Sequence, residues 1–217
     1  MIKELLFMSD IFDKYYKHYD EWYEKNKCAY LSELEAIEKV LPKSGRGLEI
    51  GVGTARFAHP LGIAIGIDPA KNMVRIAKQR GVDVLVGYGE CLSFKDTTFD
   101  YIAIIITLCF VKDPLKVLKE TRRVLKKHGR VIICIIDKNS FLGEYHQKKK
   151  SIFYKEAHFF SVEELTKFLK TMGFNTSLYY QTISTLPDEM NSIEKPQRGY
   201  GRGSFVAVRA KKSLESN

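Results

Sequence analysis

The sequence predicts an α/β fold in which a mostly parallel sheet is covered by helices on both faces. Between residues 47 and 136, short apolar runs alternate with segments of helical spacing. These runs are apolar throughout, which is typical of strands buried on both sides. Two β-rich segments near the C-terminus are joined by a loop too short for a crossover helix, so this last pair is expected to be antiparallel.

Helices are expected in the N-terminal segment. Within residues 10–40, apolar and aromatic side chains recur at helical spacing, and Ser32 with Glu35 has the spacing of a capping box. Two helices that end before Pro42 are therefore predicted.

The central elements follow in regular order. Strands are predicted at 47–50, 63–67, 82–86, 101–106 and 130–136. A glycine turn with a short helix to Ala58 follows the first strand, and helices are predicted at 69–79 and 115–127. Asp113 and Pro114 suit the start of the last helix, and Gly129 suits its exit.

The alternation stops after residue 137. Residues 138–160 are an aromatic and basic insertion without a clear period, and Ser161 with Glu164 then predicts a capped helix that Gly173 ends. The final strands are expected at 174–184 and 204–210. We expect one domain over 1–217, divided into an N-terminal helical segment (1–43), a core (44–137), the insertion (138–160) and a C-terminal helix with a strand pair (161–217).

Composition predicts a globular protein of the cytoplasm. The longest apolar run, 102–111, is about half of what a membrane span needs, and the first 20 residues lack the pattern of a signal peptide. The cysteines, Cys28, Cys91, Cys109 and Cys134, are far apart and form no C-x-x-C pair, so free thiols and no metal are expected. The net charge of +9 lies mostly after residue 100 but is dispersed along helices, apart from the cluster 148–150, which favours a solvated face over a nucleic-acid partner.

The stretch GLEIGVGTARF, residues 47–57, indicates a ligand site. In an open α/β sheet the ligand lies beyond the carboxyl ends of the strands, and Gly51 and Gly53 would let backbone N–H groups approach it. Arg56 stands where a dinucleotide-binding motif has its third glycine, which disfavours an NAD-dependent dehydrogenase.

Two acidic residues restrict the class of ligand further. Asp68 ends the second strand, where a carboxylate can accept hydrogen bonds from the hydroxyls of a ribose. Glu49 precedes the glycine turn, and its charge would repel a phosphate and attract an ammonium group. A ligand with a ribose and an amino-acid tail satisfies both. The structural alternatives are a tight turn for the glycines, a helix N-cap for Asp68 and a core position for Met73.

At these residues the chain resembles the class I S-adenosylmethionine-dependent methyltransferases, in particular the ubiquinone/menaquinone-biosynthesis-like branch (methyltransferase type 11). The resemblance covers about residues 45–136 and is carried by GLEIGVGTARF, GIDPAKNM, VGYGECLSFKDTTFDYI and VLKKHGRVII, in the expected order and spacing. It implies a Rossmann-like sheet of seven strands, with an antiparallel strand beside the fifth. It also implies S-adenosyl-L-methionine as the cofactor.

The resemblance assigns the cofactor site residue by residue. It implies that Gly51 and Gly53 contact the methionine part, that Asp68 holds the ribose, that Met73 packs near the adenine, that Gly89 and Glu90 lie along the adenine edge and that Thr107 borders the amino-acid end. The remaining residues of the expected cofactor site are Glu49, Thr54, Pro69 and Tyr88. Tyr88 stands where the family often has an Asp that binds the adenine amino group, so it would use its hydroxyl or stack on the ring. Ala55 replaces a frequent glycine.

Methyl transfer from a sulfonium needs alignment and exclusion of water more than a catalytic side chain. A general base, where one is used, would be His18, His158 or one of Tyr15, Tyr16 and Tyr19. Residues 1–43 are expected to form a lid, with Tyr19 and Trp22 on one helix face over the cofactor. The insertion is expected to line the substrate side through Phe153, Tyr154, His158, Phe159 and Phe160.

A small or medium-sized organic molecule is therefore the expected methyl acceptor, and no membrane partner is expected. A nucleic-acid methyltransferase is disfavoured because TLCFVKDP, after the fourth strand, lacks the Pro-Pro-aromatic signature that grips a flipped base. A protein acceptor stays an alternative, as does a catalytically silent cofactor-binding protein, which the unusual Tyr88 would favour. No sequence feature predicts the attacking atom or an oligomeric state.

Overall fold

The computed structural model describes residues 9–149 and 151–213. Residues 1–8, which are part of the segment inspected for a signal peptide, and Lys150 of the basic cluster lie outside the described residues. Among the helices that the structure describes, none is long and apolar enough to cross a membrane.

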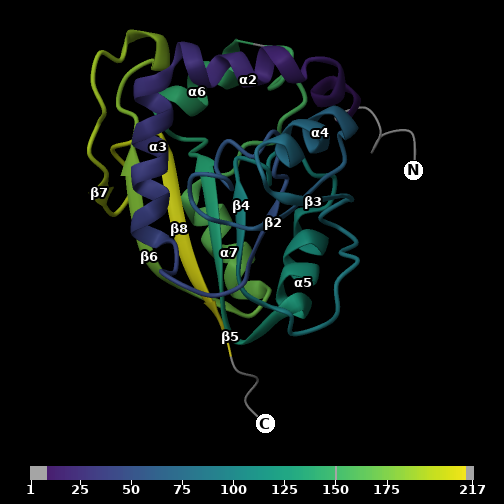
Figure 1. The fold of residues 1–217 in the computed structure, drawn as a ribbon. Coiled ribbons are helices and arrows are strands. Elements are labelled where there is room, and N and C mark those ends of the chain that lie inside the picture. The colour runs from purple at the N-terminus through teal and green to yellow at the C-terminus, as the bar shows by residue number, and fades with distance from the viewer. Residues whose placement is uncertain (1–8, 150, 214–217) are drawn as a thin grey trace.

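One sheet of eight strands forms the centre of the molecule (Figure 1). The strand order is β3-β2-β1-β4-β5-β8-β6-β7. Strands β1 to β5 are mutually parallel, and β8 lies antiparallel between β5 and β6. The bounds are β1 Gly47–Ile50, β2 Ile65–Asp68, β3 Asp83–Val86, β4 Phe99–Ile105, β5 Leu125–Ile136, β6 Phe174–Thr182, β7 Gln197–Arg198 and β8 Phe205–Lys212.

The mostly parallel sheet and the antiparallel strand beside the fifth are thereby confirmed. The eighth strand was not expected. It is the two-residue β7, which pairs with β6 at Tyr180 and Gln181 from within the loop 187–203.

Helices cover both faces of the sheet. Residues of α3 and α4 belong to one buried apolar cluster, and residues of α5 and α7 belong to the other. Helices α2 and α6 lie across the end of the sheet where β1, β2, β4 and β5 finish, at the top of Figure 1. The bounds are α2 Tyr16–Lys25, α3 Lys27–Val40, α4 Lys71–Gln79, α5 Pro114–Val124, α6 Phe141–Lys148, α7 Val162–Thr171 and the 3-10 helix η1 Pro187–Glu189.

Two predicted helix starts are confirmed by their hydrogen bonds. The Ser161 hydroxyl accepts from the Glu164 backbone N–H at 3.1 Å, and the Glu164 carboxylate accepts from the Ser161 N–H at 2.8 Å, which completes the capping box. The Asp113 carboxylate accepts from the N–H of Lys116, with Pro114 at the first position of α5.

The capping box expected at Ser32 is wrong. Helix α3 already begins at Lys27, and Ser32 lies inside it with its hydroxyl donating to the Cys28 carbonyl at 2.8 Å. The same hydroxyl accepts from the Glu194 N–H at 2.8 Å, so it joins α3 to the C-terminal loop.

Three other boundaries differ from the expectation. No helix follows the glycine turn, because Gly53 (φ +53°) and Ala55 (φ +63°) have left-handed backbones. Helix α5 ends at Val124, and β5 starts at Leu125 because this residue pairs with Phe99 of β4. The insertion contains a helix, α6, capped by the Ser140 hydroxyl.

Candidate active site

The glycine turn is fixed to the end of β2 by backbone hydrogen bonds. The N–H groups of Gly51 and Val52 both donate to the Ile67 carbonyl, at 2.9 and 3.0 Å. The N–H of Gly53 donates to Asp68 Oδ2 at 2.9 Å, while Asp68 Oδ1 accepts from the Ala70 N–H at 2.9 Å. The turn and the carboxylate therefore form one unit.

The alternative role of Asp68 as a helix N-cap is wrong, because the N-cap of α4 is Ala70 and no side chain caps this helix. Both oxygens of Asp68 keep further acceptor capacity, because a carboxylate has about four lone-pair sites. Burial raises the pKa of Asp68 to about 6, against the lowering effect of its two backbone N–H donors.

Gly51 cannot carry a side chain in this arrangement. Its φ is +73°, and a Cβ built on it would lie 2.2 Å from Cγ2 and 2.4 Å from Oγ1 of Thr107. Thr107 itself donates to the Ile105 carbonyl at 2.9 Å. The intervening Ile106 has φ +47°, which is strained for a β-branched residue and marks the end of β4 as a constrained part of the site.

Glu49 lies beneath the turn. It is 1% exposed and does not line the cavity described below. Burial raises the pKa of this carboxyl well above its usual range, and the neighbouring charge of Asp68 raises it further. One Glu49 oxygen is buried without a hydrogen-bond partner. The structure therefore places Glu49 outside the cavity lining, in contrast to its predicted contact with the cofactor.

One cavity of about 890 Å³ extends from the turn to the N-terminal helices and the insertion. It brings together most of the residues predicted for the site: Tyr19, Trp22, Gly51, Gly53, Asp68, Pro69, Met73, Tyr88, Gly89, Glu90, Thr107 and His158. A side chain at Gly89 would collide with the core, because its Cβ would lie 2.8 Å from the Ile50 side chain. The Glu90 carboxylate accepts from the Lys112 N–H at 3.1 Å.

Thr54 is buried outside the cavity lining, and its hydroxyl donates to Asp20 of α2 at 2.6 Å. Arg56 and Arg80 form ion pairs with the same carboxylate at 2.6 and 2.8 Å. Burial opposes ionisation of Asp20, but the hydrogen bonds from Arg80, Arg56 and Thr54 outweigh it and hold its pKa below the usual range. Arg56 stands where a dinucleotide-binding motif has its third glycine, and here it connects the turn to α2 through Asp20. Glu24 also accepts from Arg56.

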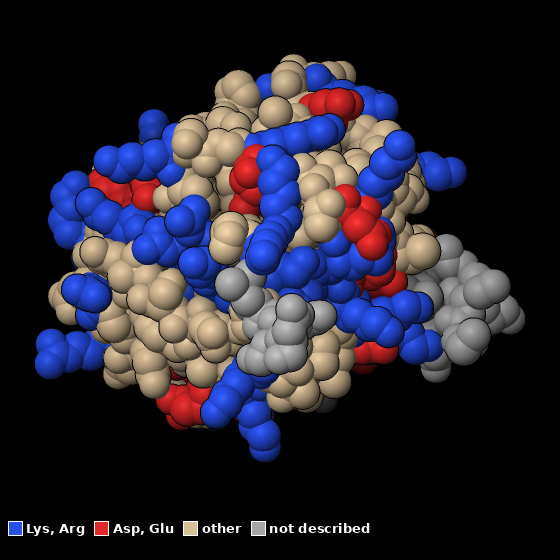
Figure 2. Space-filling view, turned by 90° about the horizontal axis from the view of Figure 1, so that it is seen from below, with Lys and Arg blue, Asp and Glu red and all other residues tan. Residues whose placement is uncertain are grey.

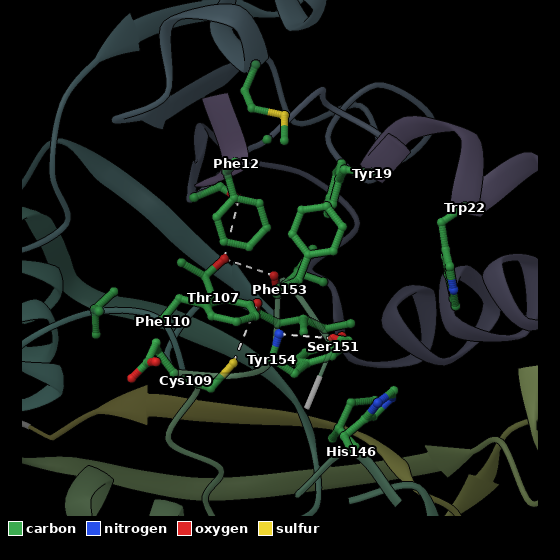
Figure 3. A pocket seen from close by; sticks show the side chains of 18 of the residues that line it. Phe12, Tyr19, Trp22, Thr107, Cys109, Phe110, His146, Ser151, Phe153 and Tyr154 are labelled. Carbon is green, nitrogen blue, oxygen red and sulfur yellow. Dashed lines mark hydrogen bonds between the residues drawn. The ribbon is translucent and has the colours of Figure 1, made fainter. Parts of the chain in front are cut away.

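Aromatic rings from three segments line the cavity and contact one another (Figure 3). Phe12 from the N-terminal segment stacks on Phe153 of the insertion at 5.2 Å, and Phe110, which follows β4, stacks on Tyr154 at 5.7 Å. Tyr19 meets Phe153 edge to face at 6.1 Å. The N-terminal segment and the insertion therefore meet across the cavity, as expected for a cover and a substrate wall.

Other expected wall residues lie elsewhere. Phe159 and Phe160 are 6% and 3% exposed and belong to the two apolar cores, so their proposed place in the cavity wall is wrong. Tyr15 and Tyr16 do not line the cavity, and the Tyr16 hydroxyl accepts from Arg75 at 3.1 Å. They are unsuited to act as a base there.

The histidines that line the cavity differ in how far they are buried. His18 and His158 are exposed at its rim, and the His158 N–H donates to the Cys109 carbonyl at 2.8 Å. His146, which the sequence did not single out, lies 4.3 Å from the Tyr154 ring, and burial followed by the charge of Lys149 lowers its pKa to about 4. Its imidazole is neutral at pH 7.

Glu33 is the other cavity residue that the sequence did not single out. It lies on α3, is 3% exposed and lines the cavity. Burial raises the pKa of Glu33 to about 8. Among the described residues, no group of three or more His, Cys, Asp or Glu side chains could hold a metal ion.

One face of the molecule, away from the cavity, is rich in Lys and Arg (Figure 2). Lys and Arg side chains are spread over the face seen from below, which lies away from α2 and α6 (Figure 2). The exposed Lys126 and Lys127, at the start of β5, belong to this end of the sheet. The aromatic cavity therefore does not open onto this basic face.

Comparison with known proteins gives consistent matches. Residues 48–133 match a family described as a methyltransferase domain. The crystal structure of an S-adenosylmethionine-dependent methyltransferase, possible histamine N-methyltransferase, from Thermotoga maritima is 47% identical, with a TM-score of 0.92 over 94% of this chain and 99% of that one. An uncharacterized protein of Methanocaldococcus jannaschii is 47% identical over 94% of this chain and 99% of its own length. A demethylmenaquinone methyltransferase of Bacillus cereus is 32% identical over 62% of this chain and 64% of its own length.

Proposed function

The chain belongs to the S-adenosylmethionine-dependent methyltransferase family, and we propose that it transfers the methyl group of this cofactor to a small or medium-sized organic molecule bound in the aromatic cavity. The observation that carries the proposal is the continuity of the cavity, which joins the glycine turn and Asp68 to the enclosure of Phe12, Tyr19 and Phe153.

The residues present fit the cofactor. Gly51 and Gly53 of the glycine turn line the cavity and present backbone without side chains to it. We assign the amino-acid end to this turn and to Thr107, and the ribose hydroxyls to the remaining lone pairs of Asp68. Met73, Tyr88, Gly89 and Glu90 line the part of the cavity that we assign to the adenine.

The cofactor supplies a methyl group already activated on a sulfonium. The chain has to orient the acceptor toward this methyl group and keep water out of the cavity. Tyr19 and Phe153 serve the second purpose, because they bring the N-terminal segment and the insertion into contact. The Tyr19 ring also faces Gly53, where a Cβ would lie 3.4 Å from its hydroxyl oxygen, so it is placed to cover the cofactor side.

The enclosure supports a small acceptor over a macromolecule. The cavity wall is formed by segments that pack on one another, and the basic face lies away from the cavity (Figure 2). The Thermotoga maritima relative is described as a possible histamine N-methyltransferase, and a molecule of that size agrees with a cavity of about 890 Å³. We also propose a cytoplasmic location, since all four cysteines are free, which is typical of a reducing compartment.

The test combines binding and turnover. Calorimetric titration with S-adenosylhomocysteine should show binding to the wild type, a loss of at least about tenfold in Asp68→Asn and a change of less than about twofold in Asp83→Asn. Asp83 is an exposed acid at the start of β3 outside the cavity, so it is the matched control. Acceptors are then screened for release of S-adenosylhomocysteine from the methyl donor. Absence of binding to the wild type would refute the cofactor assignment, and binding without turnover on any acceptor would refute the enzyme.

A further inference from the structure

Glu33 is a buried acid without a partner in the wall of the cavity. One of its carboxylate oxygens is buried and has no hydrogen-bond partner, and no ion pair between described residues includes it. The side chain comes from α3, not from the turn or the strand ends that carry the groups assigned to the cofactor. A carboxylate in such a place is unfavourable unless a cation or a hydrogen-bond donor meets it.

The surroundings of Glu33 favour an organic cation. Tyr19, Tyr23 and Tyr154 line the same cavity as Glu33, and a negative charge on Glu33 would raise the pKa of each of these tyrosines. The Tyr23 hydroxyl donates to the Tyr19 oxygen at 2.7 Å, so it is already engaged. Aromatic faces attract ammonium groups, most strongly where water is excluded. On the insertion side His146 is neutral because its pKa is lowered to about 4, and the exposed Lys149 and His158 also line the cavity.

Glu33 is distinct from the acid that we assign to the cofactor. Asp68 ends β2 and is held by the glycine turn, whereas Glu33 lies on α3. Of the acidic residues that line the cavity, Glu33 is the one that comes from α3.

We propose that the methyl acceptor carries a basic nitrogen and that the carboxylate of Glu33 binds its protonated form within the enclosure of Tyr19, Tyr23 and Tyr154. The nitrogen returns this proton to the Glu33 carboxylate before its lone pair attacks the methyl group. The substrate class is then a small primary or secondary amine with an apolar body. This inference rests on the proposed function, because it names the acceptor class of the same cavity. Glu33 is a binding residue that selects among acceptors, and the methyl donor is held without it.

The test compares amines with neutral molecules of the same shape. Binding of 2-phenylethylamine, tryptamine and butylamine is measured by calorimetry against 2-phenylethanol, indole-3-ethanol and 1-butanol, with and without saturating S-adenosylhomocysteine. The variants are Glu33→Gln, which keeps the shape and removes the charge, and Glu38→Gln, the control on the exposed face of the same helix. We expect at least one amine to bind the wild type at least about tenfold more tightly than its alcohol.

Glu33→Gln should abolish this preference, with alcohol and S-adenosylhomocysteine affinities within about twofold of the wild type and a melting temperature that is not lowered. Glu38→Gln should change none of these values. The inference is overturned if no amine is preferred by the wild type, if the preference survives in Glu33→Gln, or if amine and S-adenosylhomocysteine affinities fall together. A wild type that binds amines but not S-adenosylhomocysteine would contradict the cofactor assignment and leave the role of Glu33 standing, so the two failures are distinguishable.

Discussion

The substitution Gly51→Ala tests the geometry on which the site depends. Two effects add at this position. A left-handed backbone costs an L-residue with a Cβ about 1–2 kcal/mol, and φ is +73° here. The new Cβ would also lie 2.2 Å from Thr107 Cγ2, and overpacking of this kind costs about 1–3 kcal/mol. We therefore expect Gly51→Ala to lower the free energy of unfolding by about 2–5 kcal/mol.

Gly62→Ala is the matched control for the backbone effect. Its φ of +67° is nearly the same, but nothing lies within 4 Å of the position of its Cβ. It should therefore cost about 1 kcal/mol, since only the backbone effect remains. The second substitution Thr107→Ala removes both atoms that clash most severely, so it should restore about 1–2 kcal/mol to Gly51→Ala. Urea unfolding followed by circular dichroism gives the free energies of unfolding of the wild type, of Gly51→Ala, of Gly62→Ala and of the double variant Gly51→Ala/Thr107→Ala. If Gly51→Ala is no more destabilising than Gly62→Ala, or if Thr107→Ala restores nothing, the described packing of the turn is wrong.

Three further predictions concern stability. Asp20→Asn should lower the free energy of unfolding by about 2 kcal/mol, because hydrogen bonds to two arginines lose their charge, while Glu21→Gln, in a 3.8 Å exposed pair, should change it by less than about 0.5 kcal/mol in the same urea assay. Ala55→Gly relieves a φ of +63° but removes a fully buried methyl group, so the two effects should offset one another to within about 1 kcal/mol, and a loss of more than about 2 kcal/mol would contradict the backbone described. The folded-state pKa of Glu33 is raised to about 8, so its stabilising contribution is present at low pH and is lost as the pH rises toward 8. Stability of the wild type should fall between pH 6 and 8 by on the order of 2 kcal/mol more than that of Glu33→Gln, and parallel profiles would refute a carboxyl titrating there.

The strands and the turn were predictable because their signals are local. A continuous apolar run identifies a buried parallel strand wherever it occurs, and an acid at the end of β2 necessarily lies beside the turn after β1, because the two strands are parallel neighbours. The spacing of these residues along the chain is therefore enough to bring Gly51, Gly53 and Asp68 together.

The missed features depend on distant partners or on burial. Thr54 was assigned to the cofactor, but its hydroxyl meets Asp20, 34 residues away, and nothing in the local pattern indicates this contact. Glu33 resembles a solvent-facing charge on an amphipathic helix, but it is 3% exposed and lines the cavity together with tyrosines of α2 and of the insertion. The helix was predicted to run to residue 127 because Lys126 and Lys127 continue the helical spacing of α5. In the structure, Leu125 pairs with Phe99 of β4, and this pairing makes residues 125–127 part of strand β5.

The same contacts link the cover of the cavity to the turn beneath it. Thr54 and Arg56 belong to the segment after Gly53, and both hold Asp20, while Tyr19 faces Gly53 from the preceding position of α2. A shift of the turn is therefore transmitted to α2 by charged hydrogen bonds, which are short and directional. Because Tyr19 also contacts Phe153, such a shift would reach the insertion as well. The groups that hold the methyl donor and those that enclose the acceptor consequently form one connected structure, and Asp20 is the residue through which a change on one side acts on the other.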